Sequence, residues 1–176
     1  MENEKRQSIK IGRAVALALL LLCFASCLFF LSSCGPSRGA VTSDAALGYC
    51  PVCRMKVKAS DSWAAEIYYN DRTKVMFESP GDMLVFYTSP KGYEVDDAYK
   101  DQANIERIVV KDYQSKQATD AHQAMFVYKS KITGPMGADF LPFAKRADAE
   151  AFVAANGGNL LSLNEVTGEM ARDLRK

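Results

Sequence analysis

Residues 73–88, TKVMFESPGDMLVFYT, decide the fold because they join the end of one strand to the start of one helix. Residues 73–78 mix polar with apolar side chains, and we interpret them as a half-buried strand. Ser79 then offers an N-cap hydroxyl, Pro80 suits the first helical position, and Asp82 places a negative charge in the first turn. The stretch therefore predicts a strand followed at once by a short helix.

The segments on either side of this stretch complete a first unit. Residues 62–70, SWAAEIYYN, are rich in aromatic and branched side chains, and an Asn-Asp-Arg turn joins them to residues 73–78, so the two segments predict a hairpin. Beyond the helix, residues 104–113 predict another strand. The expected order is strand, strand, helix, strand.

The second half of the chain repeats this order. We expect strands over 124–129 and 139–144, a helix over 146–155 that ends at an Asn-Gly-Gly signal, and a strand over 159–163. A terminal helix is expected over 165–175.

Two triplets with the same spacing cross from a strand into a helix, which indicates two related units. The alternative is that the two units are unrelated, because any strand-turn-helix with an acidic residue in the first helical turn would give a similar spacing. The predicted fold class is α+β, a single compact domain of two ββαβ units that follows a lipoprotein signal and a flexible tether. The matched triplets are Phe77, Asp82 and Phe86 in the first half, and Phe143, Asp148 and Phe152 in the second.

The N-terminus has the order of a lipoprotein signal: a basic segment, an apolar run over 14–31, and small residues before Cys34. The residues Leu-Ser-Ser-Cys at 31–34 resemble the lipobox of bacterial lipoproteins, which implies cleavage before Cys34 and lipidation of its thiol. Several acyl chains give a stable anchor. The alternative is that the apolar run stays as an uncleaved membrane anchor.

We therefore divide the chain into a signal peptide over 1–33, a lipid-anchored flexible tether over 34–48, and a folded domain over 49–176. The expected location is the cell envelope, on the membrane and facing the periplasm, with the outer membrane favoured. The whole chain has a formal charge of +1, and removal of the leader, with four basic and two acidic residues, leaves about −1. This balance gives no indication of nucleic-acid binding.

Residues 50–55, CPVCRM, carry the chemistry. A thiolate combined with a thioether selects Cu(I) over harder divalent ions, because polarisable sulfur matches a soft cation. In an extended segment Cys53 and Met55 would project to the same face and could converge on one ion. We predict both as metal ligands, with Cys50 as an auxiliary one.

Two more residues outside this motif are candidate ligands. Met136 lies in residues 134–137, GPMG, where glycines and a proline indicate an irregular loop that presents the side chain rather than packing it. His122 is the only histidine; it could be a further ligand, a pH-sensitive gate or a structural residue. Asp120 could orient its ring.

Other interpretations of the two cysteines predict different behaviour. A zinc finger would need four ligands, which the chain does not offer in the usual spacing. A thioredoxin-type pair should open a helix after a strand, and this pair follows a tether. A membrane-tethered thiol-disulfide protein nevertheless remains the main alternative, and it would make Cys50 essential. No catalytic constellation is recognisable, so we do not expect an enzyme.

At these motifs the chain resembles the NosL family, lipoprotein accessory factors for nitrous oxide reductase. The resemblance covers Cys50 to about Leu163 and rests on CRM at 53–55 and on GPMGADFLPF at 134–143. It implies a periplasmic chaperone on two ββαβ units that takes one Cu(I) from a copper donor and delivers it to an apo-cuproenzyme, nitrous oxide reductase or similar.

The resemblance also implies ligands by position. Cys53, Met55 and Met136 would hold the copper. The family commonly has glycine where Arg54 stands, and we expect this cation to lower the pKa of the adjacent thiol.

The first half also looks like the YHS-type metal-binding module. That module often has cysteines where this chain has Glu78 and Asp82. We therefore expect these two residues to add no ligand, and the loop of the second half to complete the site.

Overall fold

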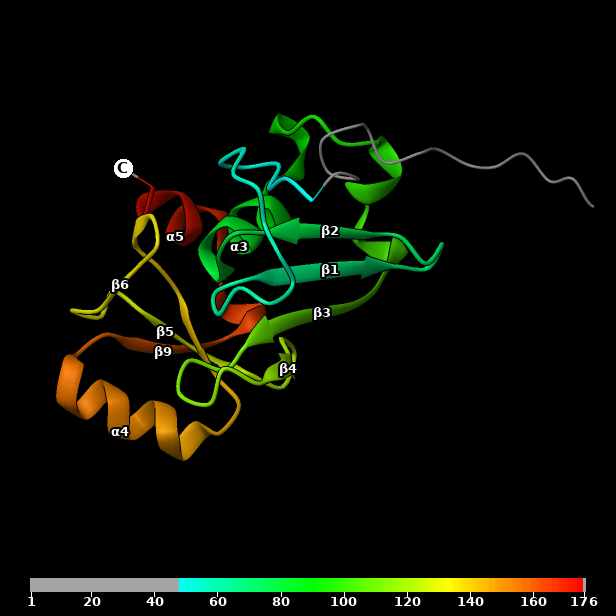
Figure 1. The fold of residues 1–176 in the computed structure, drawn as a ribbon. Helices are drawn as coiled ribbons and strands as arrows, with labels where there is room; N and C mark the ends of the chain where they lie inside the picture. Colours follow the sequence, from blue (N-terminus) through cyan, green and yellow to red (C-terminus); the bar gives the residue numbers. More distant parts are fainter. Residues whose placement is uncertain (1–47, 176) are drawn as a thin grey trace, which may run out of the picture. The chain divides into compact units, whose positions relative to one another are not determined.

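A computed structural model describes residues 48–175 (Figure 1). The predicted signal peptide over 1–33, the lipidated Cys34 and all but the last residue of the predicted tether lie outside the described residues. Within residues 48–175, no helix has the length and apolar character needed to cross a membrane.

The first unit is an antiparallel sheet with one helix. Strands β1 (Ala65–Tyr69) and β2 (Lys74–Phe77) form the predicted hairpin, and helix α3 (Pro80–Thr88) follows directly. Strand β3 (Ile105–Lys111) returns beside β1, and the short β4 (Ala118–Asp120) adds to its free edge. The strand order is therefore β2-β1-β3-β4.

The second unit has the same plan. Strand β5 (Met125–Tyr128) pairs antiparallel with β8 (Leu141–Phe143) on one side and with β9 (Asn159–Ser162) on the other, and α4 (Arg146–Asn156) connects β8 to β9. The order β8-β5-β9 matches β2-β1-β3, with the first strand of the unit in the centre. The prediction of an α+β fold of two ββαβ units is confirmed.

Equivalent phenylalanines pack in equivalent ways in the two units. The ring centroids of Phe77 and Phe86 are 5.3 Å apart, and those of Phe143 and Phe152 are 5.1 Å apart. In each pair one ring comes from the second strand and the other from the following helix. The repeated spacing in the sequence therefore reflects one strand-to-helix contact made twice.

Between β5 and β8 the chain forms a small hairpin. Strands β6 (Thr133–Gly134) and β7 (Gly137–Ala138) pair with each other, so Pro135 and Met136 lie at the turn. The segment that was expected to be an irregular loop is therefore held by its own backbone pairing.

Other segments differ from the prediction. Between α3 and β3 the chain forms three short 3-10 turns, and the aspartates at 96 and 101 cap two of them. The terminal helix begins later than expected: α5 (Gly168–Asp173) starts after Thr167, whose hydroxyl accepts from Met170 N and fixes the helix start there.

Strand β5 joins the two units because both of its faces are buried. Phe126 and Tyr128 belong to the large core under the first sheet and α3. Met125 and Val127, on the opposite face, belong to a smaller core under α4. Successive side chains of a strand point to opposite faces of the sheet, so a strand that lies between two cores contributes side chains to each in turn. Helix α5 packs against α3, so the end of the chain closes over the first unit.

The Gly157-Gly158 pair after α4 gives a test of this packing. A Cβ on Gly158 (φ 105°) would lie 2.9 Å from both Tyr128 O and Val127 Cγ1, whereas one on Gly157 (φ 72°) would meet nothing within 4 Å. We expect Gly157→Ala to cost about 1 kcal/mol from the left-handed backbone alone, and Gly158→Ala to cost roughly 2–3 kcal/mol because the contact with β5 is added. Urea unfolding of the full chain measures both, and equal losses would contradict the packing.

Candidate metal site

Residues 49–56 form a tight turn that presents both thiols. Tyr49 and Lys56 form an antiparallel bridge that closes the turn. Inside it, Cys50 N donates to Met55 O at 2.8 Å, and Arg54 N donates to Cys50 O at 2.9 Å. Arg54 has a φ of 64°, the left-handed value that turns the backbone back on itself. Glycine adopts this conformation at least cost, which explains why a glycine suits this position.

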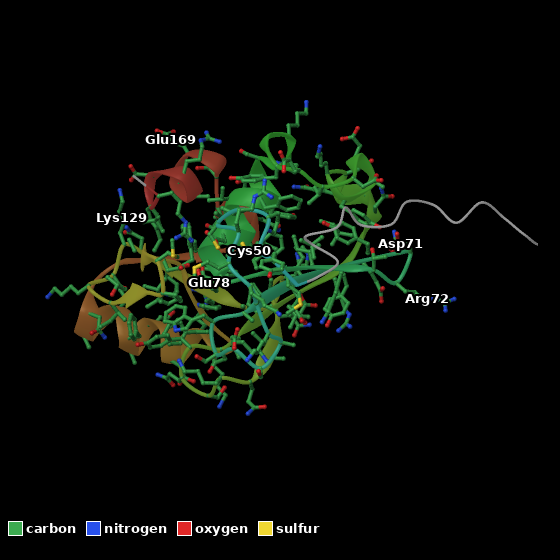
Figure 2. All side chains as sticks on the ribbon, turned by 45° about the horizontal axis from the view of Figure 1, so that its top comes forward. Cys50, Asp71, Arg72, Glu78, Lys129 and Glu169 are labelled. Carbon is green, nitrogen blue, oxygen red and sulfur yellow. The ribbon has the colours of Figure 1, made fainter. Side chains whose placement is uncertain are left out.

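The two thiols face carboxylates from the strand-to-helix segment. Cys50 is fully buried, and its Sγ donates to Asp82 Oδ2 at 3.3 Å. Cys53 is half-buried, and its Sγ lies 3.8 Å from Glu78 Oε2. Figure 2 shows Cys50 and Glu78 close to each other beside α3. The two sulfur atoms and one carboxylate oxygen of Asp82 all lie within 4.8 Å of one another.

Asp82 is held in this place by the start of α3. Ser79 caps the helix, and its Oγ accepts from Asp82 N at 3.3 Å. The carboxylate is only 1% exposed, and its Oδ1 forms an ion pair of 2.9 Å with Arg175 Nη2. A buried carboxylate needs such partners because an unpaired charge is costly to desolvate.

This environment keeps both thiols protonated. Burial, together with the negative charge of Asp82, raises the pKa of Cys50, and backbone N–H groups of the turn oppose this only in part. Burial and a hydrogen bond with Asp82 raise the pKa of Cys53 far above its ordinary value. Burial and the neighbouring Asp82 also raise the pKa of Glu78. Each thiol must therefore lose its proton before its sulfur can bind a metal ion as a thiolate.

The donor set fits a soft cation. A thiolate–metal bond is about 2.3 Å long, so two sulfur atoms bound to one ion are at most about 4.6 Å apart. The sulfur atoms of Cys50 and Cys53 lie within 4.8 Å of each other, so a small movement would let both bind one ion. Asp82 adds an oxygen donor, and the buried position keeps out competing water. Cys50 and Cys53 would hold the ion, with Asp82 beside them, and two thiolates favour soft metals over magnesium or calcium.

A pocket of about 930 Å³ connects part of this cluster to solvent. Cys53 and Asp82 line it from the first unit, and Met136 lines it from the β6–β7 turn. Met136 is 49% exposed. The structure therefore brings Cys53 and Met136, two of the predicted ligands, to the same pocket from opposite halves of the sequence.

The other predicted ligands have different surroundings. Met55 is 46% exposed and is not among the residues that line the pocket. The premise that Cys53 and Met55 share the face of an extended segment is wrong, because the left-handed Arg54 between them breaks the alternation. His122 is exposed in the turn between β4 and β5 and does not line the pocket. There Asp120 Oδ1 accepts from the backbone N–H of His122.

The expected effect of Arg54 on the thiol is also wrong. Its guanidinium forms an ion pair with Glu94, with Nη2 2.6 Å from Oε2, and both side chains are exposed. The pKa of Cys53 is raised rather than lowered. Burial and the neighbouring carboxylate therefore outweigh any effect of this cation on the pKa of the thiol.

The expectation that Glu78 and Asp82 add no ligand stays a prediction, although both carboxylates lie at the thiols and one oxygen of Asp82 belongs to the cluster. Asp82 accepts from the Cys50 thiol and Glu78 from the Cys53 thiol, through the contacts given above. The sequence offered little signal for this, since Cys50 and Asp82 are 32 positions apart. The only indication was the strand-to-helix position of Asp82, which predicted a helix cap rather than a site residue.

The fold and this cluster define a class: a two-unit α+β domain with a candidate site for a soft metal ion. The family model for NosL matches residues 42–171, and the chain belongs to the NosL family. A comparison with curated protein sequences finds no match.

Two solved structures are similar to this chain. The crystal structure of the copper chaperone NosL from Shewanella denitrificans is 23% identical, with a TM-score of 0.57, and the match covers 77% of this chain and 99% of that one. The solution structure of apo-NosL from Achromobacter cycloclastes is 27% identical, with a TM-score of 0.44, and the match covers 61% of this chain and 87% of that one. The first of these likenesses supports the shared fold.

The raised thiol pKa values predict that metal binding releases protons. Because Cys50 and Cys53 are protonated at neutral pH, a metal must displace their protons, and a higher pH lowers this competition. The apparent affinity for a soft metal should rise with pH by about tenfold per unit for each proton released. Titration in weakly buffered solution between pH 6 and pH 8 measures the protons directly. A constant affinity without proton release would show that the thiols are already ionised.

Proposed function

We propose that this protein is a metallochaperone that binds one Cu(I) between Cys50 and Cys53 and passes it to an apo-cuproenzyme. The observation that carries the proposal is the convergence of two free thiols and the Asp82 carboxylate within 4.8 Å at the end of an open pocket. The likeness in fold to a copper chaperone from Shewanella denitrificans supports it. No catalytic role is proposed.

The geometry favours metal binding over thiol-disulfide exchange. A redox pair of the thioredoxin type has a thiol of lowered pKa at a helix start. Here both thiols lie in a turn that precedes β1, and their pKa values are raised. Such thiols are poor nucleophiles until a metal displaces their protons.

Transfer of the ion requires an accessible side of the site. Cys50 is buried, so the ion would be approached from the side of Cys53, where the pocket opens. Met136 lines this pocket from a hairpin turn and would act as a third, weaker ligand that yields to a ligand of the partner. A thioether is neutral, so exchange at this position needs no proton.

The remaining parts of the proposal concern where the protein works. We propose that Cys34 carries lipid and that residues 34–48 hold the domain at the periplasmic side of a membrane. The recipient we propose is nitrous oxide reductase or a similar cuproenzyme, and the source a separate copper donor. These points rest on the lipobox-like sequence and on membership of the NosL family.

Substitution of the sulfur ligands tests the site. In the reduced full chain in detergent, titrated without oxygen against a chromogenic Cu(I) chelator, Cys50→Ser and Cys53→Ser should each lower the affinity by more than about 100-fold, because a hydroxyl is harder and stays protonated. Met136→Leu should lower it by up to about tenfold while the fold is kept.

The matched control is Met76→Leu. Met76 lies in the core on β2, so the same replacement there should leave Cu(I) affinity unchanged. Wild-type affinity in both cysteine variants would exclude the proposed site. Weak metal binding together with disulfide exchange that needs both cysteines would place the protein in the redox class instead.

A further inference from the structure

Arg175, which follows α5, places its positive charge beside the candidate metal site. Its Nη2 lies 2.9 Å from Asp82 Oδ1 and 3.5 Å from Asp139 Oδ2, and it donates to Ser79 Oγ at 3.1 Å. A Cβ on Gly81 would clash with this nitrogen and with Asp139 Oδ1, so the glycine lets the guanidinium lie against the first turn of α3. The charge therefore has a fixed position next to the Asp82 carboxylate.

Arg175 also has donors that its present contacts leave unused. Asp82, Asp139 and Ser79 all contact the same nitrogen, Nη2. The buried Nε and Nη1 atoms have no hydrogen-bond partner among residues 48–175. A guanidinium offers five N–H donors. It can therefore stabilise more negative charge than these contacts place beside it.

The charge of the site after metal binding depends on the valence of the ion. Both thiols are protonated at neutral pH, so an ion that binds Cys50 and Cys53 displaces two protons. With Cu(I), a single positive charge replaces the two that leave, and the site becomes more negative by one charge. With a divalent soft ion such as Cd(II), the positive charges that arrive and leave are equal in number, and the charge of the site is unchanged.

The negative charge that Cu(I) binding adds lies beside Asp82. Cys50 Sγ is 3.3 Å from Asp82 Oδ2, and the carboxylate is only 1% exposed, so little water screens its repulsion of the two thiolates. Arg175, on the other oxygen of the same carboxylate, offsets this repulsion. Its charge also acts at the second thiol: burial and Asp82 raise the pKa of Glu78, which accepts from Cys53, and Arg175 opposes that rise.

We propose that Arg175 makes the site selective for a monovalent soft ion, because its charge compensates the negative charge that Cu(I) leaves on the two thiolates. This inference rests on the proposed binding of Cu(I) to Cys50 and Cys53. Arg175 is a positioning residue, since it acts on the ion through Asp82 and through its own charge. A divalent soft ion gains no comparable stabilisation, because its binding adds no negative charge.

A comparison of Cu(I) with Cd(II) tests this role. In the reduced full chain in detergent, titrated without oxygen against a chromogenic chelator for each ion, Arg175→Gln should lower Cu(I) affinity by about tenfold, the order expected of charges separated by one buried carboxylate. Cd(II) affinity should change by less than about threefold, because the charge of the site does not change. The chain with Cys50→Ser and Cys53→Ser together gives the background from the cysteines at 23, 27 and 34.

Two further variants separate charge from structure. Arg175→Lys keeps the positive charge and should retain the wild-type ratio of Cu(I) to Cd(II) affinity. Arg172→Gln removes an exposed charge from the same pocket, where Arg172 donates to Ser89 Oγ, and should change the ratio by less than about threefold.

The ratio also guards against a variant that folds poorly, because a loss of folded protein lowers both affinities by the same factor. Should Arg175→Gln fail to fold, the same change is made in an Asp139→Asn chain, which leaves one fewer buried carboxylate unpaired. Asparagine keeps Oδ1 for the backbone N–H groups of Gly81 and Phe140. The ratio should again fall by about tenfold relative to Asp139→Asn alone.

The outcomes distinguish this role from the proposed function. If the wild type binds no Cu(I) at Cys50 and Cys53, the proposed function fails. If it binds Cu(I), yet Arg175→Gln leaves the Cu(I) affinity unchanged or lowers both affinities by the same factor, only the role of Arg175 is overturned. A Cd(II) affinity too weak to measure in every variant would overturn it as well, because the site would then exclude the divalent ion without Arg175.

Discussion

The buried carboxylate of Asp82 is the constraint on which the site depends. It is removed from water at the first turn of α3, so its negative charge must be balanced by partners that other segments supply. Those partners are the Cys50 thiol from the turn before β1 and Arg175 from the end of the chain. The Asp82 carboxylate therefore holds the turn before β1 and the end of the chain beside the start of α3, where the candidate metal site lies.

The two-unit architecture explains why a site can form there. Each unit places an acidic residue in the first turn of its helix, but the two positions have different surroundings: Asp82 is buried, whereas Asp148 is partly exposed. The difference arises because α5 packs against α3, and the β6–β7 hairpin supplies Met136 to the pocket that Asp82 also lines. The first unit holds the thiols, and the second unit contributes to the accessible side.

Local signals were enough to predict much of the fold. The polar and apolar residues of 73–78, the cap at Ser79 and the Asn-Gly-Gly stop after α4 each act over a few residues, and the corresponding elements are confirmed. Strict alternation is absent, since residues 75–77 are all apolar and buried. The two cysteines were recognised from their spacing. The roles of Asp82, Glu78 and Arg175 could not be predicted in this way, because they depend on contacts across 25 to 96 positions and on burial that the sequence does not display. The placement of Met55 was missed because a left-handed backbone at an arginine has no local signal.

X-ray absorption at the copper edge, on the reduced full chain loaded with one equivalent of Cu(I), tests the central claim most directly. We predict a first shell dominated by sulfur at about 2.3 Å, with two thiolates, and loss of one of them in Cys50→Ser. A shell of nitrogen or oxygen alone, or one that is unchanged in Cys50→Ser, would contradict the proposed site. It would show that the turn before β1 and the first turn of α3 do not form the copper site.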